Sequence, residues 1–92
     1  MNKDEWATQF LQLKVVARSE TQEFREILCI IKKTTKMERL MNHVIERFGV
    51  PVVSVRFAYE GRRLHDDDTA EALEMKQDGV IEVFREQPWE WE

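Results

Sequence analysis

The side chains with the chemistry of a catalytic site are one cysteine and two histidines. Cys29 with His43 or His65 supplies the residue types from which a thiol nucleophile and its general base are built. Cys29 lies inside the apolar stretch FREILCIIK, however, and no motif ties either histidine to it. A buried structural thiol is inert. The sequence therefore predicts a structural cysteine and a protein that is not an enzyme.

The acidic run Asp66–Asp68 has the residue type of a calcium site but not its spacing. An EF-hand loop alternates its oxygen ligands and ends on a distant glutamate, and this run does neither. We interpret it as a solvated loop in which Asp68 or Thr69 caps a short helix through Leu73. We expect no metal and no cofactor.

A group of basic residues has the residue type of a nucleic-acid site. Generic nucleic-acid binding depends on a basic face that neutralises phosphates. Here acidic residues lie between the basic ones, and the net charge of the chain is −4. We therefore expect the rim of a peptide site or a solvated face, and no nucleic-acid partner. The basic residues are Lys32, Lys33, Lys36, Arg39, Arg62 and Arg63.

Length and composition indicate one globular domain. The chain has 92 residues, of which 42% are apolar and 35% charged, enough for one hydrophobic core. A single cysteine excludes an internal disulfide and indicates a reducing compartment, the nucleus or cytoplasm. The sequence shows no apolar run typical of a signal peptide or a membrane span, so we expect no membrane contact.

Two strands are predicted in the first third of the chain. Leu11, Leu13 and Val15 alternate with polar residues, the period of a half-buried strand. Residues 24–32 are rich in β-branched side chains and are expected to pair back as a hairpin. This second strand is apolar on both faces around residues 28–31, which burial of one face does not explain.

A helix over residues 36–48 is the clearest predicted element. Thr35 and Glu38 have the spacing of a capping box, and Gly49 offers a left-handed residue after the last turn. Pro51 prevents continuation. An apolar stripe at three- and four-residue spacing predicts burial of one helix face. It comprises Met37, Leu40, Met41, Val44, Ile45 and Phe48.

The rest of the chain predicts an α+β layer, a sheet covered on one face by one helix. Residues 53–59 alternate as a strand, Glu60 and Gly61 form a turn, and residues 62–64 return. A turn at 77–79 leads to the last strand at 80–84. We expect a flexible segment at 1–9, the domain at 10–87, and an acidic tail with two tryptophans at 88–92.

Three stretches carry a resemblance to a known family: GVPVVSVRFAYEGRRL, DDDTAEALEM and DGVIEVFREQ. They occur in the order and near the spacing found in the SUMO family of ubiquitin-like modifiers, and the chain resembles that family over about residues 11–87. The resemblance implies a β-grasp fold. Its mixed sheet would pack on one main helix in the order strand, strand, helix, strand, strand, short 3-10 helix, strand, which agrees with the elements above.

The C-terminal residues depart from the family pattern. A conjugatable SUMO ends in a diglycine whose carboxylate is joined to lysine, whereas here Gln87 is followed by PWEWE and no Gly-Gly occurs in the sequence. Glycine lets a tail thread narrow enzyme clefts, and Trp89 and Trp91 would block them. The tail is interpreted as the boundary of a longer protein, a solvated extension, or a segment that binds a partner through its aromatics.

The resemblance also implies a groove between the second strand and the helix. There an extended SUMO-interacting peptide, apolar with acidic flanks, adds to the strand edge. Cys29 and Val44 replace large aromatics, and Ile30 replaces a lysine, so we expect a shallow, weakly basic groove. Carried over by position, the floor is Cys29, the wall is Ile31, Leu40 and Val44, and the basic rim is Lys32 and Arg39. Alternatively, the N-terminal segment or a dimer partner covers this edge, or the edge is purely structural.

A second surface implied by the resemblance faces the SUMO-conjugating enzyme. The matching residues are Glu60, Gly61, Arg63 and Asp78, with Gly79 where the family has an aspartate. The plain alternative is that these residues only form turns.

The resulting hypothesis is a SUMO-like domain that binds proteins non-covalently in the SUMO pathway, through the groove, the second surface or both. One alternative is a covalent SUMO-type modifier whose diglycine is absent from this sequence. Another is a structural domain that self-associates through its second strand. We expect a monomer that forms at most a weak dimer.

Overall fold

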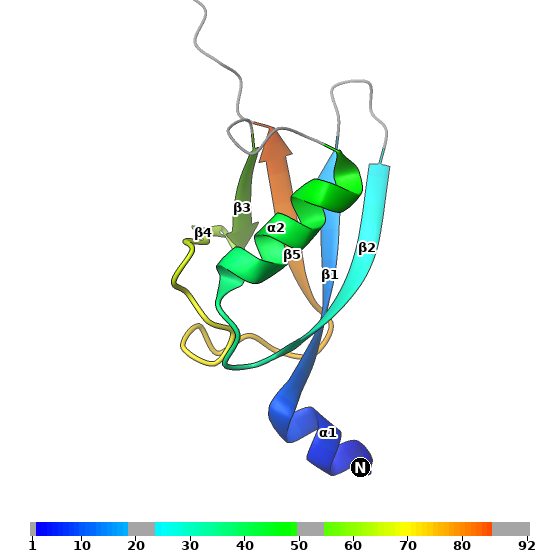
Figure 1. Cartoon of the computed structure of the whole chain (residues 1–92), viewed down its shortest axis with the longest axis vertical. Helices are drawn as coiled ribbons and strands as arrows, with labels where there is room; N and C mark the ends of the chain where they lie inside the picture. Colours follow the sequence, from blue (N-terminus) through cyan, green and yellow to red (C-terminus); the bar gives the residue numbers. More distant parts are fainter. Residues whose placement is uncertain (1, 19–23, 50–54, 86–92) are drawn as a thin grey trace, which may run out of the picture.

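A five-stranded sheet crossed on one face by a single helix forms the domain (Figure 1). The computed structural model describes residues 2–18, 24–49 and 55–85. Along the chain the elements are α1 (Lys3–Gln9), β1 (Phe10–Arg18), β2 (Phe24–Lys32), α2 (Met37–Phe48), β3 (Val55–Tyr59), β4 (Arg62–Arg63) and β5 (Gly79–Arg85). The predicted start of the third strand at residues 53 and 54, the Pro51 helix stop and the tail at 88–92 lie outside the described residues.

The sheet is mixed, with strand order β2-β1-β5-β3-β4. β1 and β2 form the expected antiparallel hairpin, with Leu13 opposite Cys29. β5 runs parallel to β1 and antiparallel to β3, which places the last strand between the first and third. This arrangement is the predicted β-grasp architecture, and it leaves β2 and β4 as the two edges.

The hydrophobic core lies between α2 and the face of the sheet that it covers. Leu13 and Val15 of β1 and Ile81 of β5 are fully buried, as the alternation of β1 predicts. From α2 the buried side chains are Met37, Leu40, Met41, Val44 and Phe48, and Ile45 packs against them. Burial of each such side chain stabilises the fold by about 1.5–3 kcal/mol. The helical stripe of the sequence is therefore confirmed as the core face.

The predicted extent of α2 and its end at Gly49 are confirmed, whereas the predicted side-chain cap at its start is wrong. Gly49 adopts the left-handed conformation, with φ of 70°, and its N–H donates to Ile45. At the start, no side chain caps the helix, so the capping box at Thr35 and Glu38 does not form.

Backbone carbonyls of a distant loop take the place of that cap. The N–H of Met37 donates to the carbonyl of Asp68 at 2.7 Å, and the N–H of Glu38 donates to the carbonyl of Asp66 at 3.1 Å. These bonds satisfy two of the amides that a helix start leaves without partners. The first turn of α2 is thus tied to the loop that follows β4.

A turn replaces the predicted short helix after this loop. Residues 70–74 form hydrogen-bonded turns, without the repeated bonds of a helix. Thr69 acts as the predicted cap, because its Oγ1 accepts from the N–H of Ala72 at 3.1 Å. Asp68 does not cap this segment, since its Oδ2 accepts from the N–H of His65 at 2.7 Å.

Residues Lys3–Gln9, within the segment that the sequence predicts to be flexible, form the helix α1. Asn2 and Glu5 make a reciprocal capping box: the N–H of Glu5 donates to Asn2 Oδ1 at 2.8 Å, and Asn2 N–H donates to Glu5 Oε1 at 3.4 Å. Trp6 stacks on Phe10 with ring centroids 6.1 Å apart. The spacing of Asn2 and Glu5 was the overlooked sequence signal.

Two threonine substitutions test the origin of these caps. Thr69→Ala removes a hydroxyl that accepts a backbone hydrogen bond and should lower the free energy of unfolding by about 1 kcal/mol. Thr35→Ala, the matched control, should lower it by about 0.5 kcal/mol or less, because no cap is lost. Urea unfolding measures both. A larger cost at Thr35 than at Thr69 would contradict the observed start of α2.

Candidate functional site

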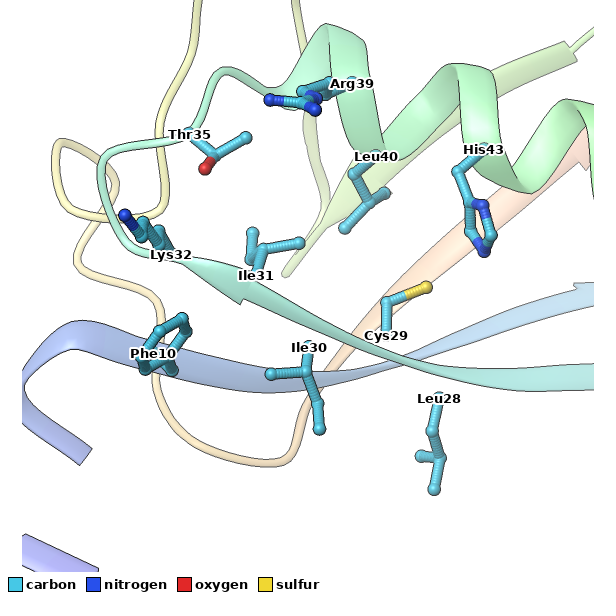
Figure 2. Close-up of a pocket in the computed structure, with 10 residues that line it drawn as sticks. All are labelled: Phe10, Leu28, Cys29, Ile30, Ile31, Lys32, Thr35, Arg39, Leu40 and His43. Atoms are coloured by element: carbon cyan, nitrogen blue, oxygen red, sulfur yellow. The ribbon is translucent and has the colours of Figure 1, made fainter. Parts of the chain in front are cut away.

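A groove lies between the edge strand β2 and α2. Figure 2 shows the side chains around it, which come from the start of β1, from β2, from the turn after β2 and from the first half of α2. The lining residues are Phe10, Leu28, Cys29, Ile30, Ile31, Lys32, Thr35, Arg39, Leu40 and His43.

The side chains of β2 alternate between the groove and the opposite face of the sheet. Cys29 and Ile31 point toward α2, whereas Leu28 and Ile30 point away from it (Figure 2). Leu28 is 61% exposed and Ile30 is 57% exposed. The strand is therefore apolar on both faces, as the sequence indicates, and among the described elements a helix covers only the face toward α2.

The backbone of β2 presents free hydrogen-bonding groups along its outer edge. At the end of the hairpin, the N–H of Lys33 donates to the directly opposite carbonyl of Gln9 at 2.9 Å. In an antiparallel ladder, residues that lie directly opposite each other alternate between pairs that exchange backbone hydrogen bonds and pairs that do not. Counted back along β2 from that bonded pair, Ile31 and Cys29 also belong to bonded pairs, so their N–H and C=O groups point toward β1. Those of the even-numbered residues from 26 to 32 point outward, where an added strand would lie.

Five of the six residues predicted for the groove surround it in the structure. Leu40 and Cys29 are buried at its base, with 3% and 7% of their surface exposed, and Ile31 is half-buried beside them. Lys32 and Arg39 are exposed at its mouth. Neither of these two cations forms an ion pair within the described part of the chain.

The sixth residue, Val44, does not line the groove. Its side chain is fully buried in the core, because it faces the middle of the sheet rather than the β2 edge. His43 and Thr35 line the groove instead. His43 follows Leu40 by three residues, and this helical spacing was the signal that could have found it.

Cys29 has the environment of a structural thiol. Burial raises the pKa of the Cys29 thiol above its ordinary value, and the positive charge of Arg47 offsets part of the rise. No hydrogen bond joins Cys29 to His43 within the described residues. An activated cysteine requires a lowered pKa, so this arrangement is the opposite of a nucleophile and base.

The second predicted surface begins at the β3–β4 turn. Glu60 and Gly61 both have positive φ, 51° and 80°, the conformation of a two-residue type I′ hairpin. Glycine suits this conformation because it has no Cβ. Glu60, Gly61 and Arg63 are all exposed, and Arg63 lies on the edge strand β4.

Asp78 lies at the same end of the sheet as this turn, because Tyr59 pairs with Ile81 across β3 and β5. Its carboxylate already has a partner: Asp78 Oδ1 accepts from Gln12 Nε2 at 3.0 Å. The N–H of Asp78 also donates to the carbonyl of Gln12 at 2.8 Å. The acidic groups of the second surface are thus an exposed Glu60 and a bonded Asp78.

Gly79 is required by the packing of Tyr59. A Cβ at position 79 would lie 2.9 Å from Tyr59 Cε1 and 3.0 Å from the carbonyl oxygen of Lys76. The Tyr59 hydroxyl is held in place by the N–H of Lys76, which donates to it at 3.2 Å. A side chain at position 79, such as the aspartate of the family pattern, would displace the Tyr59 ring.

Other classes of site find no support in residues 2–18, 24–49 and 55–85. This part of the chain contains no group of three or more His, Cys, Asp or Glu side chains placed to hold a metal ion. It also contains no helix long and apolar enough to cross a membrane. Asp67 of the acidic run instead lies 3.5 Å from the Lys36 ammonium.

Fold and groove together define a ubiquitin-like domain, and comparison with known proteins narrows the class. The chain aligns with an archaeal ubiquitin structure, from Caldiarchaeum subterraneum, with a TM-score of 0.75. The match covers 88% of this chain and 99% of that one. Sequence identity is 16%, so this likeness shows the fold alone.

Sequence comparison shows the family. Residues 11–84 match the family model described as ubiquitin-2 like Rad60 SUMO-like. The chain is 42% identical over 79 residues to a small ubiquitin-related modifier of Caenorhabditis elegans, across 86% of this chain and 82% of that protein. The chain belongs to the SUMO-like family of ubiquitin-fold proteins.

Substitution of Gly79 tests its contact with Tyr59. Gly79→Ala should lower the free energy of unfolding by about 1–3 kcal/mol, because the added methyl forces the ring or the Lys76 carbonyl to move. Glu82→Ala, an exposed position on the same strand, serves as the control and should change it by about 0.5 kcal/mol or less. Equal stability of the two variants in urea would show that position 79 has room for a Cβ.

Removal of the Cys29 thiol tests its raised pKa. In the unfolded chain the thiol ionises at its ordinary pKa, whereas in the folded chain it stays protonated to higher pH. The folded state therefore loses stability as pH rises above that ordinary value. Between about pH 8 and about pH 10, the wild type should lose more free energy of unfolding than Cys29→Val, which has no titrating group. Equal losses would contradict the burial of the thiol.

Proposed function

We propose that this protein is a SUMO-like interaction domain that binds extended peptides non-covalently at the β2 edge. The observation that carries the proposal is the open edge of β2 beside a groove with an apolar base and two cations at its mouth. The ligand would be a SUMO-interacting segment with an apolar centre and acidic flanks. Cys29, free and buried, suits a reducing compartment such as the nucleus or cytoplasm.

Backbone pairing would supply the main attraction. The outward N–H and C=O groups of Leu28, Ile30 and Lys32 are available to an added strand, which would extend the sheet beyond β2. Alternate side chains of that strand would enter the groove between Ile31 and Leu40. Because Cys29 leaves the base without a large aromatic ring, we expect modest affinity.

Charge would select acidic peptides and set their position. Lys32 at the end of β2 and Arg39 in the first turn of α2 come from different elements, and both line the groove. An acidic residue next to the apolar centre of the peptide would lie between these two cations. Such exposed pairs act chiefly on specificity and association rate, and each contributes about 0.2–1 kcal/mol.

The second surface supports docking of the SUMO-conjugating enzyme as a second activity of the same domain. Glu60 and Arg63 are exposed on a rigid hairpin, and Asp78 lies at the same end of the sheet. The two surfaces belong to opposite sheet edges, β4 and β2. A peptide and the enzyme could therefore bind together, as an adaptor requires.

Covalent modification is the alternative function, favoured by the likeness to a small ubiquitin-related modifier. It requires a diglycine, which this sequence lacks. Incubation with SUMO-activating and SUMO-conjugating enzymes and ATP tests it directly. A thioester or isopeptide adduct would favour the modifier, and none is expected.

Amide chemical shifts of the isotope-labelled domain test where ligands bind. Titration with an acidic-flanked apolar peptide should shift residues 28–32 and 35–43. Titration with the conjugating enzyme should instead shift residues 60–63 and 78. Unchanged shifts of residues 28–43 at saturating peptide would reject the groove as the binding site. Unchanged shifts of residues 60–63 and 78 with the conjugating enzyme would reject the second surface.

Charge reversal at the groove mouth should weaken peptide binding. Lys32→Glu combined with Arg39→Glu should raise the dissociation constant by about tenfold or more, because two attractive contacts become repulsive. Arg62→Glu combined with Lys76→Glu is the matched control, since it changes the net charge equally at exposed positions that do not line the groove. Calorimetry measures both variants. If both double substitutions weaken peptide binding equally, the groove cations act only through the net charge of the domain.

A further inference from the structure

The outer face of β2 carries a pattern that is complementary to itself. Alternate positions of β2 carry Glu26, Leu28, Ile30 and Lys32, in the order acid, apolar, apolar, base, and the long side chain of Lys32 at the strand end also reaches the mouth of the groove. All four are exposed, and the two apolar ones are more than half exposed. In a strand that runs in the opposite direction, the order is base, apolar, apolar, acid. The strand is therefore complementary to an antiparallel copy of itself.

The same four residues carry the free backbone groups of the edge. The bond from Lys33 N–H to the Gln9 carbonyl sets the alternation of the hairpin, so residues 26, 28, 30 and 32 direct N–H and C=O away from β1. An antiparallel neighbour that matches their backbone groups therefore also meets their side chains. An exposed strand edge of this kind is a template for another chain.

We propose that β2 pairs in antiparallel orientation with β2 of a second copy of this chain, about a twofold axis at Cys29. Leu28 then lies opposite Ile30 of the second copy, and Glu26 lies opposite Lys32 of the second copy. Each contact occurs twice by symmetry. The two sheets join into one, with both α2 helices on the same face.

Among the possible twofold axes along β2, only the axis at Cys29 places an acidic residue opposite a basic one. An axis at Leu28 would place Glu26 opposite Ile30, and an axis at Ile30 would place Lys32 opposite Leu28. An axis between two residues would set outer-face side chains against inner-face ones, which a sheet does not allow. The axis at Cys29 is therefore the register that the side chains of β2 select.

The face toward α2 is compatible with the same register. Ile27 lies opposite Ile31 of the second copy, and both are only half-buried in the single chain. Beyond them Arg25 would meet Lys33, but Arg25 is already held within its own chain. Its Nη1 donates to the carbonyl of Phe48 at 3.0 Å, and its guanidinium lies 4.8 Å from that ring. The shared ladder therefore ends near Glu26 and Lys32.

A second copy accounts for exposed side chains of β2 that point away from α2. Leu28 and Ile30 point away from α2, and an acidic peptide would gain nothing from the nearby carboxylate of Glu26. In the proposed dimer, apolar residues of one copy lie opposite apolar residues of the other, and acidic residues lie opposite basic ones. The inference does not rest on the proposed peptide function, although a peptide and a second copy exclude each other because both need the same edge.

Light scattering over a range of concentrations, with single and compensating charge changes, tests the pairing. The wild-type mass should rise from 11.1 kDa toward twice that value as concentration increases. Glu26→Lys and Lys32→Glu should each raise the dimer dissociation constant roughly tenfold, because two opposite-charge pairs become like-charge pairs. Combining both changes in one chain, or mixing the two single variants in equal amounts, should restore the wild-type value.

Arg39→Glu separates this proposal from the peptide groove. Arg39 lies outside the ladder, so its reversal should weaken the acidic peptide and leave the dimer unchanged. Glu26 lies 3.7 Å from Lys14 within its own chain, so Glu26→Gln is added as a variant that creates no repulsion there, and circular dichroism confirms folding. Its dimer should be weakened less than that of Glu26→Lys.

Three results would overturn the pairing. They are a wild type that stays monomeric up to millimolar concentration, a dimer that neither single charge reversal weakens, and a double variant that fails to recover. The second result would locate self-association on another surface. The third would show that Glu26 and Lys32 do not meet across the axis.

Discussion

A single helix, α2, covers one face of a five-stranded sheet. The other features of the structure depend on this limited cover. Burial of the α2 stripe against β1 and β5 forms the core, with Val44 and Leu13 fully enclosed. Among the described residues, the same packing leaves the opposite face without a covering helix and β2 without a neighbouring strand on its outer side. Both proposed uses of β2 therefore depend on the strand edge that this arrangement leaves open.

The strand β2 shows how one segment serves both the core and the surface. Cys29 and Ile31 contact the groove beneath α2, while Leu28 and Ile30 lie on the uncovered face. A peptide would use the first pair and the open backbone, and a second copy would use both pairs. Because one edge accepts one strand at a time, concentration of the protein and of its ligands would decide which is bound.

Loops hold the helix and the last strand in place through backbone contacts rather than side-chain motifs. The carbonyls of Asp66 and Asp68 receive the first amides of α2, and Gly79 lets Tyr59 pack against the start of β5. The carbonyl contacts depend on backbone position more than on residue type, whereas position 79 requires glycine. This is consistent with an archaeal ubiquitin that shares the fold at 16% identity.

Local periodicity in the sequence determined the strands, the extent of α2 and its end at Gly49, because each depends on residues close together in the chain. Of the six residues that the family resemblance predicted for the groove, five line the hollow between β2 and α2. Tertiary structure alone decided that β2 is an edge, since strand order is set by which strands pack together. It also decided that Val44 belongs to the core and that carbonyls some thirty residues away, rather than Thr35, cap α2, because both outcomes depend on distant segments meeting in space.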